Sequence, residues 1–218
     1  VLHNASNVGH NLKDHLGSDI HYRARVPTLN QDLGPMLGKL RAGLQYILRR
    51  RGPLSLSLNQ GGGFVKINPD ALGPELQLYF SPVSYTRAPV GVRPLMKPDP
   101  FRGFLMGFNP CKPTSTGYLE ISSDDPMAQP KIYPNYLDTD YDQEMMIKGI
   151  RLIRQIAGAS ALQSMIESEL SPGADADSDV KIAKFISQQA WTVFHPCCTC
   201  RMGKDPIDSV VDPNLQVY

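Results

Sequence analysis

The order of hydrophobic patterns along the chain constrains its fold most strongly, because strand patterns come first and helical patterns come afterwards. Residues 18–26 alternate between apolar and polar side chains, which is typical of a half-buried strand. Residues 82–100 are rich in Pro and Gly and predict a long surface loop or lid. Without strand–helix–strand alternation, the pattern predicts an α+β fold, an antiparallel sheet with helices packed on one face. Further short strands are expected at residues 62–67, 75–80, 101–108 and 117–122.

Helical spacing of apolar residues marks three segments, which are residues 36–51, a segment that begins at Asp140, and residues 180–193. Asp140 and Gln143 are expected to form a capping pair at the start of the second segment. The inward faces of the second and third segments are expected at Met146, Ile150, Ile153 and Ala157, and at Ile182, Ile186 and Ala190.

Composition and charge limit the class of partner. The chain has 218 residues, of which 41% are hydrophobic and 20% charged, and this suits a globular protein. The net charge of +1 gives no reason to expect nucleic acid or an anionic membrane as partner. The run Arg49-Arg50-Arg51 ends an expected helix, and a solvated helix end is the simpler interpretation. No transmembrane segment is predicted, because no apolar stretch reaches the required length of about 20 residues; the expected location is cytoplasmic, with membrane association left open.

The chain begins at Val1 without Met and ends at Tyr218 within an expected strand. Both features predict a piece of a longer protein.

Three of the four cysteines, Cys197, Cys198 and Cys200, lie beside a histidine. Structural zinc sites use two separated pairs of ligands, so this spacing predicts reduced thiols around a turn and no metal site.

His195 follows the last expected helix directly, and Pro196 restrains the turn after it. An imidazole can accept a proton at neutral pH, which makes His195 a candidate general base. These residues alone favour a structural histidine, because a single histidine is weak evidence for catalysis.

Four motifs follow one another along the chain. They are Val8-Gly9-x-Asn11-Leu12-Lys13-Asp14-His15; Ser115-Thr116-Gly117-Tyr118-Leu119 with Asn135-Tyr136-Leu137; His195-Pro196-x-x-Thr199-Cys200-Arg201-Met202-Gly203; and Ser209-Val210-Val211-Asp212-Pro213-x-Leu215-x-Val217-Tyr218. In type and order they resemble the motifs of the glucose–methanol–choline family of oxidoreductases. The resemblance covers nearly the whole chain and favours the catalytic interpretation of His195.

The resemblance implies FAD-dependent oxidation of a small alcohol to an aldehyde or ketone. Family members bind FAD in an N-terminal Rossmann-like domain and pass hydride from the alcohol to the flavin, while the residue matching His195 takes the hydroxyl proton. The electron acceptor, a quinone or oxygen, stays open. No G-x-G-x-x-G sequence occurs, so the phosphate-binding motif is expected before Val1, and a second catalytic His or Asn is expected after Tyr218.

The same resemblance implies a division of the chain into three parts. Residues 1–16 are expected to lead from a missing FAD-binding domain, residues 17–193 to form the substrate-binding domain of a two-domain flavoenzyme, and residues 194–218 to carry His195 back to the flavin. Asp14 and His15 are interpreted as a hydrogen-bonded loop pair at a domain junction, outside the catalytic centre.

Asn59 and Gln60 resemble the family segment whose acidic or amide residue points at the substrate. A surface or strand-capping amide is an equally good interpretation of Gln60. Its neutral side chain argues against strong selection for a quaternary ammonium substrate, although aromatic faces also bind cations. Phe80 is a third candidate for substrate binding, and plain core packing is favoured for such aromatics. Phe194 and Asp212 are candidates for cofactor binding.

Cys198 stands where the family motif has glycine, and a positive φ there would strain it. Two alternatives to alcohol oxidation remain. One is a hydroxynitrile lyase of the same family, although Thr199-Cys200-Arg201-Met202-Gly203 looks more like the dehydrogenase branch. The other is a non-catalytic binding fragment.

Overall fold

The computed structural model describes residues 5–86 and 97–218, and the chain divides into two units that each combine segments distant in sequence. Unit 1 comprises Val1–Gly17, Pro110–Met145 and Trp191–Tyr218, whereas unit 2 comprises Ser18–Asn109 and Met146–Ala190. The assignment of residues 17–193 to a substrate-binding domain stays a prediction.

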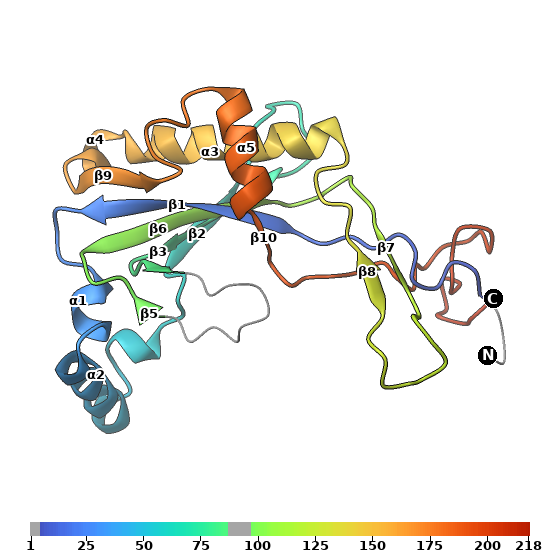
Figure 1. The fold of residues 1–218 in the computed structure, drawn as a ribbon, viewed down its shortest axis with the longest axis horizontal. Coiled ribbons are helices and arrows are strands. Elements are labelled where there is room, and N and C mark those ends of the chain that lie inside the picture. Colours follow the sequence, from blue (N-terminus) through green and yellow to red (C-terminus); the bar gives the residue numbers. More distant parts are fainter. Residues whose placement is uncertain (1–4, 87–96) are drawn as a thin grey trace. The chain divides into compact units, whose positions relative to one another are not determined.

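The sheet of unit 2 is built around β1 (Leu16–Ala24), which pairs in antiparallel fashion with β6 (Gly103–Pro110) and β9 (Ile166–Ser171) (Figure 1). From β6 the order continues to β3 (Leu76–Ser81) and β2 (Gly61–Val65), and β2 and β3 are antiparallel. The predicted alternation is confirmed, since Ile20, Tyr22 and Ala24 are buried. The first two residues of β1 pair with β10 (Trp191–Thr192) inside unit 1.

Two long helices lie together along one side of this sheet, α3 (Asp140–Ala157) and α5 (Asp179–Gln189), with the short α4 (Ser160–Gln163) beside them (Figure 1). They confirm the predicted α+β class. The predicted inward residues of both helices are buried except Ala190, which lies beyond α5; they are Met146, Ile150, Ile153, Ala157, Ile182 and Ile186. The remaining helices are α1 (Leu29–Leu33), α2 (Met36–Arg49) and the short η1 (Pro53–Ser55). Among the helices of the described residues, none is long and apolar enough to cross a bilayer.

Gly149 allows α3 to approach β6 closely. A Cβ at Gly149 would lie 2.0 Å from Cε2 of Phe108, whose side chain is fully buried. Because a close-packed core cannot move such a ring freely, we expect Gly149→Ala to lower the free energy of unfolding by about 1–3 kcal/mol. Gly43→Ala in α2 is the matched control, since nothing lies within 4 Å of a Cβ there. It should raise the free energy of unfolding by about 0.5–1 kcal/mol. Urea unfolding measures both, and equal effects would contradict the close approach.

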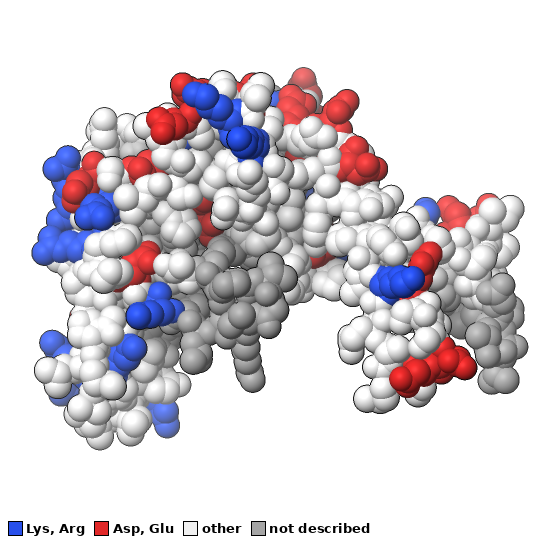
Figure 2. All heavy atoms as spheres, viewed as in Figure 1, with Lys and Arg blue, Asp and Glu red and all other residues white. Residues whose placement is uncertain are grey.

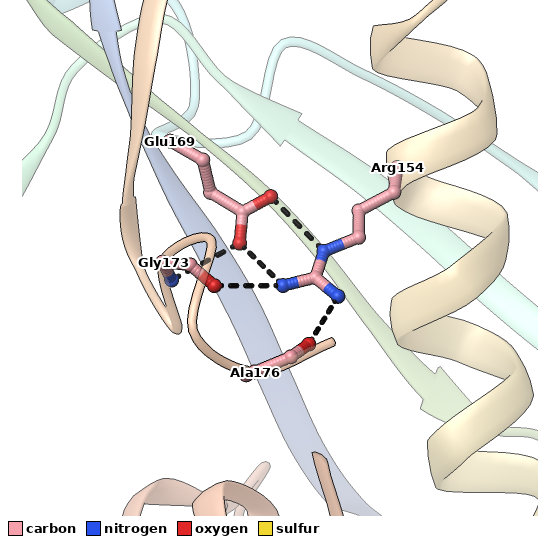
Figure 3. Close-up of polar contacts among 4 residues, drawn as sticks. All are labelled: Arg154, Glu169, Gly173 and Ala176. Carbon is pink, nitrogen blue, oxygen red and sulfur yellow. Dashed lines mark hydrogen bonds and ion pairs between the residues drawn. The ribbon is translucent and has the colours of Figure 1, made fainter. Parts of the chain in front are cut away.

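A part-buried ion pair fastens β9 to α3 (Figure 3). Nε of Arg154 donates to Glu169 over 3.0 Å, and Nη2 donates to Glu169 over 2.7 Å. The same guanidinium also donates to the carbonyl oxygens of Gly173 and Ala176, at 3.0 and 2.6 Å. Hydrogen bonding to Glu169 raises the pKa of Arg154 above its ordinary value. The bidentate geometry therefore fixes the loop after β9 against the helix.

Unit 1 contains a hairpin of β7 (Tyr118–Glu120) and β8 (Lys131–Tyr133), with the rings of Tyr118 and Tyr133 stacked at 4.7 Å. Asp142, in the first turn of α3, is buried and accepts hydrogen bonds from the backbone N–H groups of Thr114 and Ser115, both at 2.8 Å. This contact ties the segment before β7 to the helix start.

Two sequence predictions are wrong in detail. Asp140 and Gln143 do not cap α3; instead the hydroxyl of Thr139 accepts the N–H of Asp142, and the side chain of Gln143 donates to the carbonyl of Leu137. The last helix ends at Gln189 rather than 193, because Ala190 is extended and the next residues form β10.

The predicted surface loop or lid at residues 82–100 stays a prediction. Residues 87–96 lie outside the described residues, whereas the flanking β4 (Tyr85–Thr86) and β5 (Lys97–Pro98) pair with each other. The strands β8, β9 and β10 were not expected from the sequence.

Candidate active site

The carboxylate of Asp14 connects three distant segments of unit 1. Its Oδ1 accepts the backbone N–H of His15 at 2.9 Å and that of His195 at 2.8 Å. Its Oδ2 accepts the hydroxyls of Tyr136 and Thr192. Four donors therefore converge on one carboxylate, and one of them is the main chain of His195.

These contacts alter the ionisation of the carboxylate and of Tyr136. Burial alone would raise the pKa of Asp14, but hydrogen bonds from Thr192, Tyr136, His195 and His15 outweigh it and hold the pKa below its ordinary value. Burial and the hydrogen bond to Asp14 raise the pKa of Tyr136 to about 12. Asp14 is thus an anion, and Tyr136 a neutral donor, across the neutral pH range.

Backbone pairing holds the His195 segment against the first motif of the chain. Lys13 and Cys197 exchange backbone hydrogen bonds in an antiparallel bridge, and the N–H of Val193 donates to the carbonyl of His15 at 2.9 Å. The rings of His15 and His195 meet edge to face at 5.6 Å. Asp14 and His15 form the predicted hydrogen-bonded pair, and residues 13–15 lie against residues 193–197.

His195 and the preceding Phe194 are both exposed, Phe194 by 78% of its surface. Phe194 has φ of +61°, and its N–H donates to the hydroxyl of Thr192. Since positive φ is costly for a bulky residue, the surrounding hydrogen bonds must enforce this turn. The turn leaves an aromatic ring and an imidazole accessible on consecutive residues.

Cys198 has φ of +74°, so the strain predicted from its replacement of glycine is confirmed. Its Sγ lies 3.4 Å from that of Cys197, and all four cysteines are free thiols. The hydrogen bond to Cys198, together with burial, raises the pKa of Cys197. Within the described residues, no group of His, Cys, Asp or Glu could hold a metal ion.

The carboxylate of Asp212 closes its own turn. Its Oδ1 accepts the backbone N–H groups of Asn214 at 2.8 Å and Gln216 at 2.9 Å. The backbone of Asp212 also donates to the carbonyl of Gln216. A turn-forming role accounts for this residue, and a cofactor contact stays a prediction.

The three substrate candidates belong to unit 2, whereas Phe194, His195 and Asp212 belong to unit 1. Asn59 and Gln60 are exposed and directly precede β2, where the N–H of Gln60 donates to the carbonyl of Phe80. The Phe80 ring is half-buried and packs against Phe104 at 5.4 Å. This contact supports a packing role for Phe80, and substrate binding by all three residues stays a prediction.

Sequence reasoning missed the Asp14 cluster, although Asp14 and Tyr136 lie within two of the quoted motifs. Thr192 precedes His195 by three residues and carried no motif of its own. The carboxylate of Asp14 and the phenol of Tyr136, in separate motifs, were a usable indication, but no pattern revealed that they meet each other and Thr192.

Comparison with known proteins shows which family the chain resembles. Residues 113–218 match the family model described as GMC oxidoreductase. An oxygen-dependent choline dehydrogenase of Staphylococcus saprophyticus is 34% identical over 94% of this chain and 36% of its own length. An alcohol dehydrogenase (acceptor) of Pseudomonas putida is 35% identical over 100% of this chain and 38% of its own length. The crystal structure of pyridoxine 4-oxidase from Mesorbium loti has a TM-score of 0.75 at 27% identity, covering 99% of this chain and 37% of that one. The chain therefore spans little more than a third of the length of these relatives.

Proposed function

We propose that this chain belongs to the GMC oxidoreductase family and supplies the catalytic base of an FAD-dependent enzyme that oxidises an alcohol. The observation that carries the proposal is the exposed imidazole of His195, whose main chain is fixed by the Asp14 carboxylate. The relatives are named for choline, alcohol and pyridoxine, which all carry a hydroxyl group.

The residues of unit 1 fit a planar ring system. Phe194 offers an exposed aromatic ring, and the next residue offers an imidazole that can exchange a proton. The sequence contains no G-x-G-x-x-G, which is the motif that binds dinucleotide phosphates. We therefore propose that a part of the whole protein outside this chain binds the phosphates of FAD. When bound, FAD supplies the hydride-accepting ring.

The residues of this chain supply the base and hold it in position. His195 takes the proton from the hydroxyl oxygen of the substrate, which is general base catalysis. Asp14 acts on the main chain of His195 and keeps the imidazole in one position, while Tyr136 and Thr192 keep Asp14 in place. Positioning of this kind supplies much of the rate gain, because it removes the entropic cost of bringing the groups together.

Gln60 and Asn59 are proposed as substrate contacts on the resemblance of their segment to that of the family. Their side chains are neutral, so we propose a neutral primary alcohol rather than a quaternary ammonium alcohol as the preferred substrate. Quinone and oxygen are both compatible electron acceptors.

The test uses the whole protein of which this chain is part. Its visible absorption should show bound oxidised flavin, and anaerobic addition of short and medium primary alcohols should bleach that absorption. A yellow protein that cleaves a cyanohydrin and is never bleached by alcohols would support the lyase alternative. A colourless protein that binds no added FAD would refute both activities and leave a binding fragment.

A further inference from the structure

The apolar side of helix α2 is not covered by any part of the chain that the structure describes. The helix shows six large apolar side chains with exposed fractions between 56% and 81%, and Ala42 is its one buried residue. At 100° per residue these six fall within about a third of the helix circumference, and Ala42 lies on the opposite side. Surface helices normally bury such a stripe against the core. The exposed residues are Met36, Leu37, Leu40, Leu44, Ile47 and Leu48.

The segment around this helix is uniformly cationic. Residues 33–69 contain no Asp or Glu, and they contain Lys39, Arg41, Arg49, Arg50, Arg51 and Lys66. Where α2 lies, the charged side chains visible on the surface are basic (Figure 2). The helix ends at Arg50 in the left-handed conformation, and the guanidinium of Arg50 stacks on the ring of Tyr46 at 5.1 Å. Cations therefore border the apolar stripe and cluster at the end of the helix.

These two features together select one kind of partner. A second copy of the chain would bring this uniformly positive surface against itself, which Coulomb repulsion opposes. An anionic lipid surface satisfies both features, because apolar side chains enter the acyl boundary while Lys and Arg contact the phosphates. We propose that α2 lies in the plane of an anionic membrane with its six apolar residues inserted and its cations at the headgroups. The net charge of the whole chain hides this feature, since acidic residues elsewhere balance it.

The test is co-sedimentation of the whole protein with phosphatidylcholine vesicles that contain or lack phosphatidylglycerol. We expect binding to the anionic vesicles, weaker binding to the neutral ones, and loss of binding as salt is raised. The double variant Leu40→Glu, Leu44→Glu should lower the partition coefficient at least about 10-fold, because it removes two apolar side chains that the membrane would bury. Replacing Arg49, Arg50 and Arg51 by Gln should abolish the preference for phosphatidylglycerol.

The matched control is Leu72→Glu with Val180→Glu, because these two side chains are at least as exposed as Leu40 and Leu44, belong to the same unit and lie outside α2. It should bind vesicles like the parent. Absence of parent binding to either vesicle, or equal losses in both double variants, would overturn the proposal. So would a change in the gel-filtration volume of the α2 variant without lipid, since that would show that protein covers this face.

Discussion

Replacing His195 by Ala in the whole enzyme should lower kcat/KM for the alcohol by about 100-fold or more, which is the usual loss for a missing general base. The imidazole is exposed on a turn that hydrogen bonds hold in place, and its side chain buries little surface. The variant should therefore keep its bound flavin and a melting temperature close to that of the parent. Steady-state kinetics and thermal unfolding on the same sample separate catalysis from folding.

His10→Ala is the matched control, because His10 is also exposed in unit 1, where its ring stacks on that of Tyr118 at 6.0 Å. It should leave turnover within about 2-fold of the parent. If His195→Ala instead unfolds the protein while the surviving fraction turns over normally, His195 is a structural residue.

Asp14→Asn should lower both the free energy of unfolding and kcat, because it weakens the charge-assisted hydrogen bonds that Asp14 accepts. Such bonds contribute about 1.5–3 kcal/mol, so kcat should fall about 10- to 100-fold. KM should change little, because Asp14 acts on the main chain of His195 and not on the substrate. A variant with normal kcat and reduced stability would show that the carboxylate only supports the fold.

Asp142→Asn provides the comparison, since Asp142 is a hydrogen-bonded carboxylate of the same unit that contacts Thr114 and Ser115 instead. It should lower the free energy of unfolding while kcat stays normal. Burial would raise the pKa of Asp142, but hydrogen bonds from Ser115 and Thr114 lower it below its ordinary value. The pKa of Asp14 is lowered in the same way.

For both carboxyl groups the folded pKa lies below the unfolded one. Their stabilisation is therefore complete above the ordinary Asp value of 3.8 and is lost as the pH falls through the folded pKa. Acid unfolding of the parent should be steeper in this range than that of either Asn variant. An identical acid transition in the parent and both variants would contradict the lowered pKa values.

The sequence was sufficient for the fold class and for the main elements. Period-two alternation at Ile20, Tyr22 and Ala24 correctly predicted a half-buried strand, and helical spacing correctly predicted the buried face of α3. Short strands escaped because β10 has two residues and β8 has three, which are too few to establish a period. The residues of β10 also continue the apolar helical pattern of α5. The helix nevertheless ends before them, because Ala190 is extended and β10 pairs with β1.

The polar centre could not be predicted in the same way. Asp14 meets Tyr136 and Thr192 across 122 and 178 residues of sequence, and no local pattern encodes such pairs. The exposed face of α2 is a second example. Its spacing is that of an ordinary buried stripe, and only the structure shows which side of the helix packs.

Single-turnover flavin reduction tests the central claim most directly. The whole enzyme and its His195→Ala variant are mixed anaerobically with saturating alcohol, and the loss of oxidised flavin absorbance is followed in time. Proton removal by His195 predicts rapid bleaching in the parent and bleaching slowed by about 100-fold or more in the variant, with the same final amplitude. Equal bleaching rates in the two proteins would contradict His195 as the base.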